Sequence, residues 1–150
     1  MYQKILVPLD GSEFSECSLE HVKAIAKGCS VPDVIVLMVL EIIPYRAEAG
    51  GILVESFEKD AKTRAEEYVA KVVAKLKKDG ISAKGVVLKG LPDDRILKYV
   101  DKNKVDLIIM STHGRTGIAR WAFGSVADSV VRNAKVPVLI ASPSGCRVAV

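Results

Sequence analysis

Aromatic residues and cysteines are scarce in this chain, and long apolar runs are missing. Aromatic residues make up 5% of the 150 positions, so few side chains are present to stack on bases, and despite a net charge of +4 we expect no nucleic-acid binding. The three cysteines, Cys17, Cys29 and Cys146, form no CxxC pair, and their odd number argues against a disulfide framework. No apolar run approaches the roughly 20 residues that span a bilayer, and residues 1–8 do not resemble a signal peptide. We therefore expect a cytoplasmic protein without a membrane segment.

Three signatures of known phosphate chemistry are also absent. The chain has no GxxxxGK[ST] loop, so the lysine that contacts the transferred phosphate in P-loop enzymes is missing, and fast hydrolysis is not expected. It has no GxGxxG pattern either, because Gly11 stands alone after the first apolar run, which argues against NAD binding. A phosphoacceptor domain needs an aspartate after the third strand, where this chain reads Leu88-Lys89-Gly90.

Short β-rich runs alternate with longer helical patterns, which is typical of a parallel sheet with crossover helices. The expected strands cover residues 2–8, 34–40, 82–88, 105–110 and 136–141. The second is apolar throughout, as in a strand covered on both faces, and Pro137 places the last one near an edge. We predict a single α/β domain over residues 1–150. Its fold is a doubly wound, Rossmann-like sheet of five parallel strands in the order 3-2-1-4-5, with helices on both faces.

Four helices are expected between the strands. Ser12 caps the first and Gly28 ends it, the third begins near Pro92, and the fourth follows Ser125. The predicted inward residues of the first helix are Phe14, Cys17, His21, Val22 and Ile25. Those of the second are Phe57, Ala61, Ala65, Tyr68, Val72 and Leu76, and those of the fourth are Val126, Val130, Val131 and Ala134.

A glycine-rich segment from Ser111 to Ser125 joins the fourth strand to the fourth helix. Backbone N–H groups and the positive end of a helix dipole converge at such a turn, which favours binding of a phosphate by the amides of Ser125, Val126 and Ala127. Two structural alternatives stay open. In the first, the glycines in this segment only turn the chain; in the second, Ser125 caps the helix in a capping box with Asp128.

The whole chain resembles a universal stress protein of the ATP-binding branch, from residues 4–12 to residues 136–140. The family's nucleotide motif is a glycine, two residues, a glycine, nine residues, and a glycine followed by serine or threonine. Here Gly114 and Gly124-Ser125 match, but Ser111 takes the place of the first glycine. If that position needs a positive φ, serine costs about 1 kcal/mol. If it needs space, the serine side chain crowds the sugar, so nucleotide binding is either weakened or lost.

The resemblance implies a site at the carboxyl ends of the first, second and fourth strands. Asp10 then lies beside the nucleoside and Val39 offers backbone hydrogen bonds to adenine, although Asp10 also suits an ordinary Asp-Gly turn. The expected nucleotide-binding residues are Pro8, Leu9, Asp10, Val39, Met110, Ser111, His113, Gly114, Arg115, Gly117, Gly124, Ser125 and Val126. No catalytic residue is assigned, because His113 has no triad partners. Arg115 and Arg120 either pair with phosphates or are solvated.

Two function classes follow. The first is a stress-response module that binds ATP, ADP or AMP and changes the surface presented to an unknown protein partner. The second is a slow ATP hydrolase or phosphotransfer protein using Mg²⁺, held by the phosphates and by Asp10 through water. The resemblance also implies a homodimer through residues 136–141, an apolar potential edge strand. Residues 41–55 are expected to form a flap over the cleft.

Overall fold

The computed structural model describes residues 1–42, 51–112 and 124–142, with side chains from residue 55 onward in the second range. Five parallel strands form one sheet in the order β3-β2-β1-β4-β5, as predicted. The strands are β1 (Lys4–Leu9), β2 (Asp33–Leu40), β3 (Ala83–Lys89), β4 (Leu107–Ser111) and β5 (Val138–Ala141). Their ends differ from the predicted ones by at most two residues.

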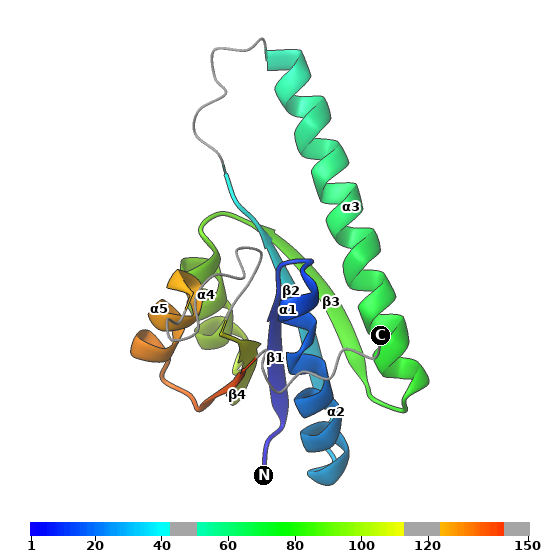
Figure 1. The fold of residues 1–150 in the computed structure, drawn as a ribbon, viewed down its shortest axis with the longest axis vertical. Helices are drawn as coiled ribbons and strands as arrows, with labels where there is room; N and C mark the ends of the chain where they lie inside the picture. Colours follow the sequence, from blue (N-terminus) through cyan, green and yellow to red (C-terminus); the bar gives the residue numbers. More distant parts are fainter. Residues whose placement is uncertain (43–50, 113–123, 143–150) are drawn as a thin grey trace.

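The helices lie in two layers, one on each side of the sheet (Figure 1). They are α1 (Glu13–Glu16), α2 (Ser18–Gly28), α3 (Gly51–Lys78), α4 (Pro92–Asn103) and α5 (Ser125–Asn133). The helices α2 and α3 cover one face, where β1 and β2 contribute Ile5, Val7, Val34 and Val36. The helices α4 and α5 cover the other face, where the strands contribute Leu6, Ile35, Leu37 and Ile108. Residues 34–38 are thus buried on both faces, as their apolar sequence predicts.

The expected first helix is divided in two at Cys17. Ser12 caps α1 as predicted, because its hydroxyl accepts a hydrogen bond from the Ser15 N–H at 3.1 Å. The Ser15 hydroxyl then donates to the Ser12 carbonyl, and the Ser18 hydroxyl donates to the Ser15 carbonyl, both at 2.8 Å. Side chains that bond backbone carbonyls in this way compete with a regular helix, which accounts for the break.

The long helix α3 packs closely on β3 at one glycine. A Cβ atom at Gly85 would overlap the side chain of Val69, so only glycine permits this approach. The helix starts at Gly51, and the flap expected over residues 41–55 is therefore wrong for residues 51–55, which are helical. Residues 43–50 of that flap lie outside the described residues.

Several residues predicted to face inward are exposed. Phe57 is 55% exposed because the first turns of α3 extend past the sheet (Figure 1). His21 is exposed because α2 buries the row Ser18, Val22 and Ala26, which leaves the preceding position on the solvent side. Phe14, on the separate α1 turn, is also exposed, and in α5 Ala127 and Val130 face the sheet while Val131 is 44% exposed.

The cysteines also depart from the expectation. Cys17 is disulfide-bonded, whereas Cys29 has a free thiol. The odd number of cysteines therefore did not exclude a disulfide. Over the described part of the chain, no helix has both the length and the apolar composition needed to cross a membrane.

Candidate functional site

The central strands β1 and β4 pair only near their amino ends. In the described residues their register contains two pairs, Ile5 with Leu107 and Leu6 with Ile108. By contrast, β1 pairs with β2 along its whole length, from Lys4 to Leu9. The connections from β1 and β4 also lead to opposite faces of the sheet (Figure 1). This is the switch point at which open α/β sheets bind ligands, beyond the carboxyl ends of the strands.

The loop after β1 is held by a compact set of hydrogen bonds around Asp10. The Asp10 Oδ1 atom accepts hydrogen bonds from the Ser12 N–H at 2.9 Å and from the Ser12 hydroxyl at 2.6 Å. The Asp10 N–H donates to the Ser15 hydroxyl at 3.4 Å, and Gly11 takes the φ of +85° that this turn requires. Asp10 therefore has the Asp-Gly turn role, and a ligand role has to coexist with it.

Ser111 is the last residue of β4 and is only 7% exposed. It pairs with Ala141 in the sheet, and the non-glycine residues with positive φ in the described chain are Ser30 and Lys104. The hypothesis that this position needs a positive φ is thus wrong. The Ser111 Oγ atom is buried and has no hydrogen-bond partner in the described residues. The other predicted strand-end residues lie where expected: Pro8 and Leu9 end β1, Val39 lies near the end of β2, and Met110 is buried in β4.

The helix α5 begins beside the end of β4. Gly124 is its N-cap, with extended φ and ψ of −60° and 152°, and its N–H donates to the Thr112 carbonyl at 2.8 Å. The capping box is wrong, because Ser125 already lies inside the helix and Asp128 pairs with Arg132 at 2.9 Å. Since a glycine N-cap has no side chain to accept hydrogen bonds, the first amides of α5 remain oriented for an anion.

The model of the universal stress protein family matches residues 1–142 of the chain, which includes all the elements above. The chain belongs to the universal stress protein family. Two proteins of Methanocaldococcus jannaschii are similar to it over most of their lengths. Universal stress protein MJ0577 is 33% identical and the alignment covers 93% of this chain and 94% of the relative; universal stress protein MJ0531 is 34% identical, with 93% and 82% covered.

Solved structures agree with the fold of this universal stress protein. The structure of MJ0577 has a TM-score of 0.77 at 34% identity, covering 95% of this chain and 96% of the other. UspA from Lactobacillus plantarum has a TM-score of 0.84 at 22% identity, covering 93% and 97%. A family protein from Arabidopsis thaliana, solved with AMP bound, has a TM-score of 0.67 at 18% identity, covering 93% and 91%.

Part of the family's glycine motif lies outside the described residues. This applies to His113, Gly114, Arg115 and Gly117, and also to Arg120. The structure does bring together the ends of β1, β2 and β4 and the start of α5, which carry the remaining predicted positions. Within the described residues, no group of three or more His, Cys, Asp or Glu side chains is placed to hold a metal ion. Asp10 is thus not part of a protein-only metal cluster there.

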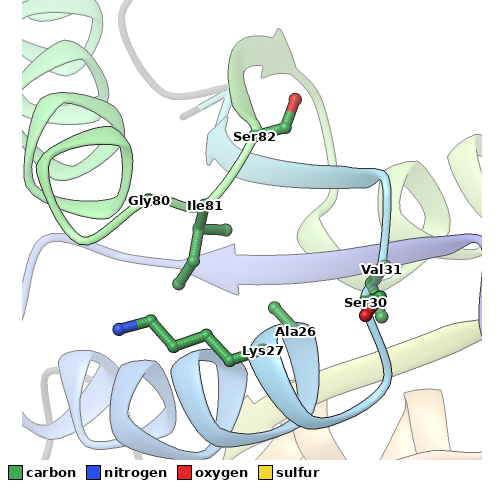
Figure 2. A pocket seen from close by; sticks show the side chains of 7 residues that line it. All are labelled: Ala26, Lys27, Ser30, Val31, Gly80, Ile81 and Ser82. Atoms are coloured by element: carbon green, nitrogen blue, oxygen red, sulfur yellow. The ribbon is translucent and has the colours of Figure 1, made fainter.

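A pocket of about 270 Å³ lies at the other end of the strands, near the amino ends of β2 and β3 and between the carboxyl ends of α2 and α3 (Figure 2). Its lining residues are Ala26, Lys27, Ser30, Val31, Gly80, Ile81 and Ser82. The chain reversals that form it are already closed by backbone hydrogen bonds from Val31 to Ala26 and from Ile81 to Leu76, each 2.9 Å. It precedes the amino ends of β2 and β3 and has no part in the switch-point site.

Two residues near the site escaped sequence reasoning. The sequence predicts Tyr68 only as part of the core-facing stripe of the second expected helix, and it gives Glu16 no role in the site. In the structure the Tyr68 hydroxyl donates a hydrogen bond to Glu16 Oε1 at 2.9 Å. No sequence signal links the two residues, because they are 52 positions apart on separate helices.

Proposed function

We propose that this universal stress protein binds an adenine nucleotide at the switch point between β1 and β4 and acts as a ligand-dependent module in the stress response. The observation that carries the proposal is the early end of the β1–β4 ladder at Leu6 and Ile108, together with the start of α5 beside Thr112 at the end of β4. Strand ends that separate at this point leave backbone groups available to a ligand, and the helix dipole favours phosphate.

The strand ends would bind the nucleoside. The Val39 backbone is half-buried near the end of β2 and can hydrogen-bond to adenine, as the family resemblance implies. The Asp10 carboxylate lies at the end of β1, where it can accept hydrogen bonds from ribose hydroxyls. Pro8, half-buried near the end of β1, supplies apolar surface there, while Leu9 and Met110 are buried in the core that supports these strand ends.

The phosphates would bind at the start of α5. The amides of Ser125 and Val126 are the nearest helical donors. Gly124, the N-cap before them, has no side chain to occupy these amides. We assign His113, Gly114, Arg115 and Gly117 to the same phosphate-binding segment from the sequence motif. A Mg²⁺ ion would then be held chiefly by phosphate oxygens, with Asp10 contributing through water.

Two family structures support the ligand class, though their low identity to this chain shows the fold alone. The Arabidopsis thaliana protein was solved with AMP bound, and another universal stress protein was solved in complex with cAMP. Both molecules are adenine nucleotides. We therefore propose this class rather than a single nucleotide.

Isothermal titration calorimetry with ATP, ADP and AMP tests the proposal. We expect saturable heat with at least one of them, because a phosphate at a helix N-terminus and a ribose at Asp10 reinforce each other. Asp10→Ala should weaken binding by roughly tenfold or more, the loss expected for a hydrogen bond to a charged group.

Two variants separate binding from folding. Asp10→Asn keeps an oxygen that accepts the Ser12 hydrogen bonds but removes the charge, so it should weaken binding while preserving the melting temperature better than Asp10→Ala. Asp101→Ala removes an exposed carboxylate paired with Lys135 and should leave binding unchanged. A wild-type titration without heat at millimolar nucleotide would refute the function.

A further inference from the structure

The helix α1 is a single turn of four residues, Glu13–Glu16. One helical turn is unstable by itself because its nucleation cost is not repaid by further hydrogen bonds. At its start, α1 is attached to Asp10 through Ser12 and Ser15. The position of the Asp10 loop therefore depends on what holds the other end of α1.

The other end of α1 continues at Cys17 into α2, where the Ser18 hydroxyl donates to the Ser15 carbonyl, and Tyr68 adds a contact from a separate helix. The Tyr68 hydroxyl donates a hydrogen bond to the Oε1 atom of Glu16, the last residue of α1, at 2.9 Å. Burial raises the pKa of Tyr68 above its ordinary value, and the hydrogen bond to Glu16 and the negative charge of Glu16 raise it further. A hydrogen bond with Ser15 lowers the pKa in part, and the negative charge of Asp10 adds the smallest contribution. The phenol thus remains a protonated donor at neutral pH, and it lies within electrostatic range of the Asp10 carboxylate.

The tyrosine stands on a rigid support. The helix α3 buries Ala65, Val69 and Val72 against the sheet, on both sides of Tyr68 in the sequence. Gly85 of β3 permits a close approach to Val69, which fixes the distance between helix and sheet. Side chains held by packing in this way can position the residues that contact a ligand.

We propose that Tyr68 is a positioning residue for the nucleotide site: through Glu16 it fixes α1 and so sets the position of the Asp10 carboxylate. This inference rests on the proposed function, since it takes Asp10 to contact the nucleotide. Tyr68 itself makes no contact with the ligand. Its removal should loosen the Asp10 loop without removing any ligand contact.

The first experiment measures ATP affinity by calorimetry in Tyr68→Phe. Loss of the hydroxyl should weaken binding roughly fivefold to tenfold, because the Asp10 carboxylate is kept but is less well pre-organised for the ligand. The matched control is Tyr99→Phe, which removes a partly buried hydroxyl from α4 on the other face of the sheet and should leave affinity unchanged. Equal losses in the two variants would overturn the proposal.

Substitutions of Glu16 and Asp10 test the route of the effect. Glu16→Gln keeps an acceptor for the tyrosine and should retain most of the affinity, whereas Glu16→Ala should match Tyr68→Phe. Combining Tyr68→Phe with Glu16→Ala should cost less than the sum of the two single losses, because both variants remove the same Tyr68–Glu16 hydrogen bond. In an Asp10→Ala background, Tyr68→Phe should have no effect; a full additional loss there would show that Tyr68 acts by another route.

Amide hydrogen exchange in the ligand-free protein gives a readout that does not depend on nucleotide. The N–H groups of Ser12 and Ser15 donate to Asp10 and Ser12, so they report the order of this loop. Both amides should exchange faster than in the wild type in Tyr68→Phe, and at the wild-type rate in Tyr99→Phe. If wild-type protein binds no nucleotide, the proposed function fails, while unchanged exchange in Tyr68→Phe refutes the positioning role separately.

Discussion

Ser111 takes the place of a motif glycine without adopting the backbone conformation that requires one. It lies in regular strand geometry at the end of β4, paired with Ala141. Of the two reasons for a glycine at this position, only close approach of a ligand remains. The buried hydroxyl also carries a cost, because it lost its contact with water and has no hydrogen-bond partner in the described residues.

Two substitutions at Ser111 separate these effects. Ser111→Ala should raise the free energy of unfolding by about 1 kcal/mol, because it removes an unsatisfied buried hydroxyl. Ser111→Gly should tighten ATP binding severalfold by removing the whole side chain, at a stability cost of roughly 0.5–1 kcal/mol for glycine in a strand. Urea unfolding and calorimetry measure the two quantities. Weaker ATP binding in both variants would show that the hydroxyl contacts the ligand.

At the scale of the elements, the sequence predicts what depends on composition along one segment. The apolar run of β2 correctly predicts a strand buried on both faces, and the alternation of strands and helices correctly predicts a parallel sheet with crossover helices. Helix faces are less predictable, because a break changes their phase. The exposed side of α2 at His21 follows from the break at Cys17, which depends on hydroxyl–carbonyl bonds of Ser15 and Ser18.

The site is predictable to a similar degree. Strand ends such as Asp10 and Ser111 follow from the order of the elements, since parallel strands end at one edge. The contact between Tyr68 and Glu16 does not, because it depends on how α3 crosses the sheet. The helix α5 begins one residue earlier than predicted, because Gly124 serves as the N-cap and Ser125 lies in the first turn.

That first turn of α5 makes an element-scale prediction. Ser125→Asp puts a negative charge where we propose the phosphates bind, so ATP affinity should fall at least about tenfold by like-charge repulsion. The same charge should stabilise α5 by roughly 0.3–1 kcal/mol through the helix dipole. Calorimetry with ATP should show the loss of affinity, and thermal unfolding should show the gain in stability.

Ser125→Asn is the neutral control and should change ATP affinity little. Adenosine, which has no phosphate, should bind Ser125→Asp as it binds wild type. If ATP binds Ser125→Asp and wild type equally, the start of α5 is not the phosphate site.

At the scale of the whole molecule, β5 is an edge strand of the sheet, and in the described residues it pairs only with β4. The Val138, Leu139 and Ile140 side chains are each partly exposed. The carbonyls of Pro137 and Ala141 accept hydrogen bonds from Ile108 and Thr112 of the β4 side. Because backbone groups alternate along a strand, the N–H groups of Val138 and Ile140 point to the outer edge. An apolar edge of this kind favours pairing with a second copy.

We therefore predict a homodimer through residues 136–141, which sedimentation at micromolar concentration should detect. Ile140→Pro removes an N–H group from the outer edge while sparing the hydrogen bonds to β4, so it should shift the protein to monomers. Ile140→Ala removes most of the side chain but keeps the N–H group, and should remain dimeric if backbone pairing forms the interface. A wild-type protein that sediments only as a monomer contradicts the prediction. Dimers that persist in Ile140→Pro count against pairing along this edge, since proline removes one of its two outward donors.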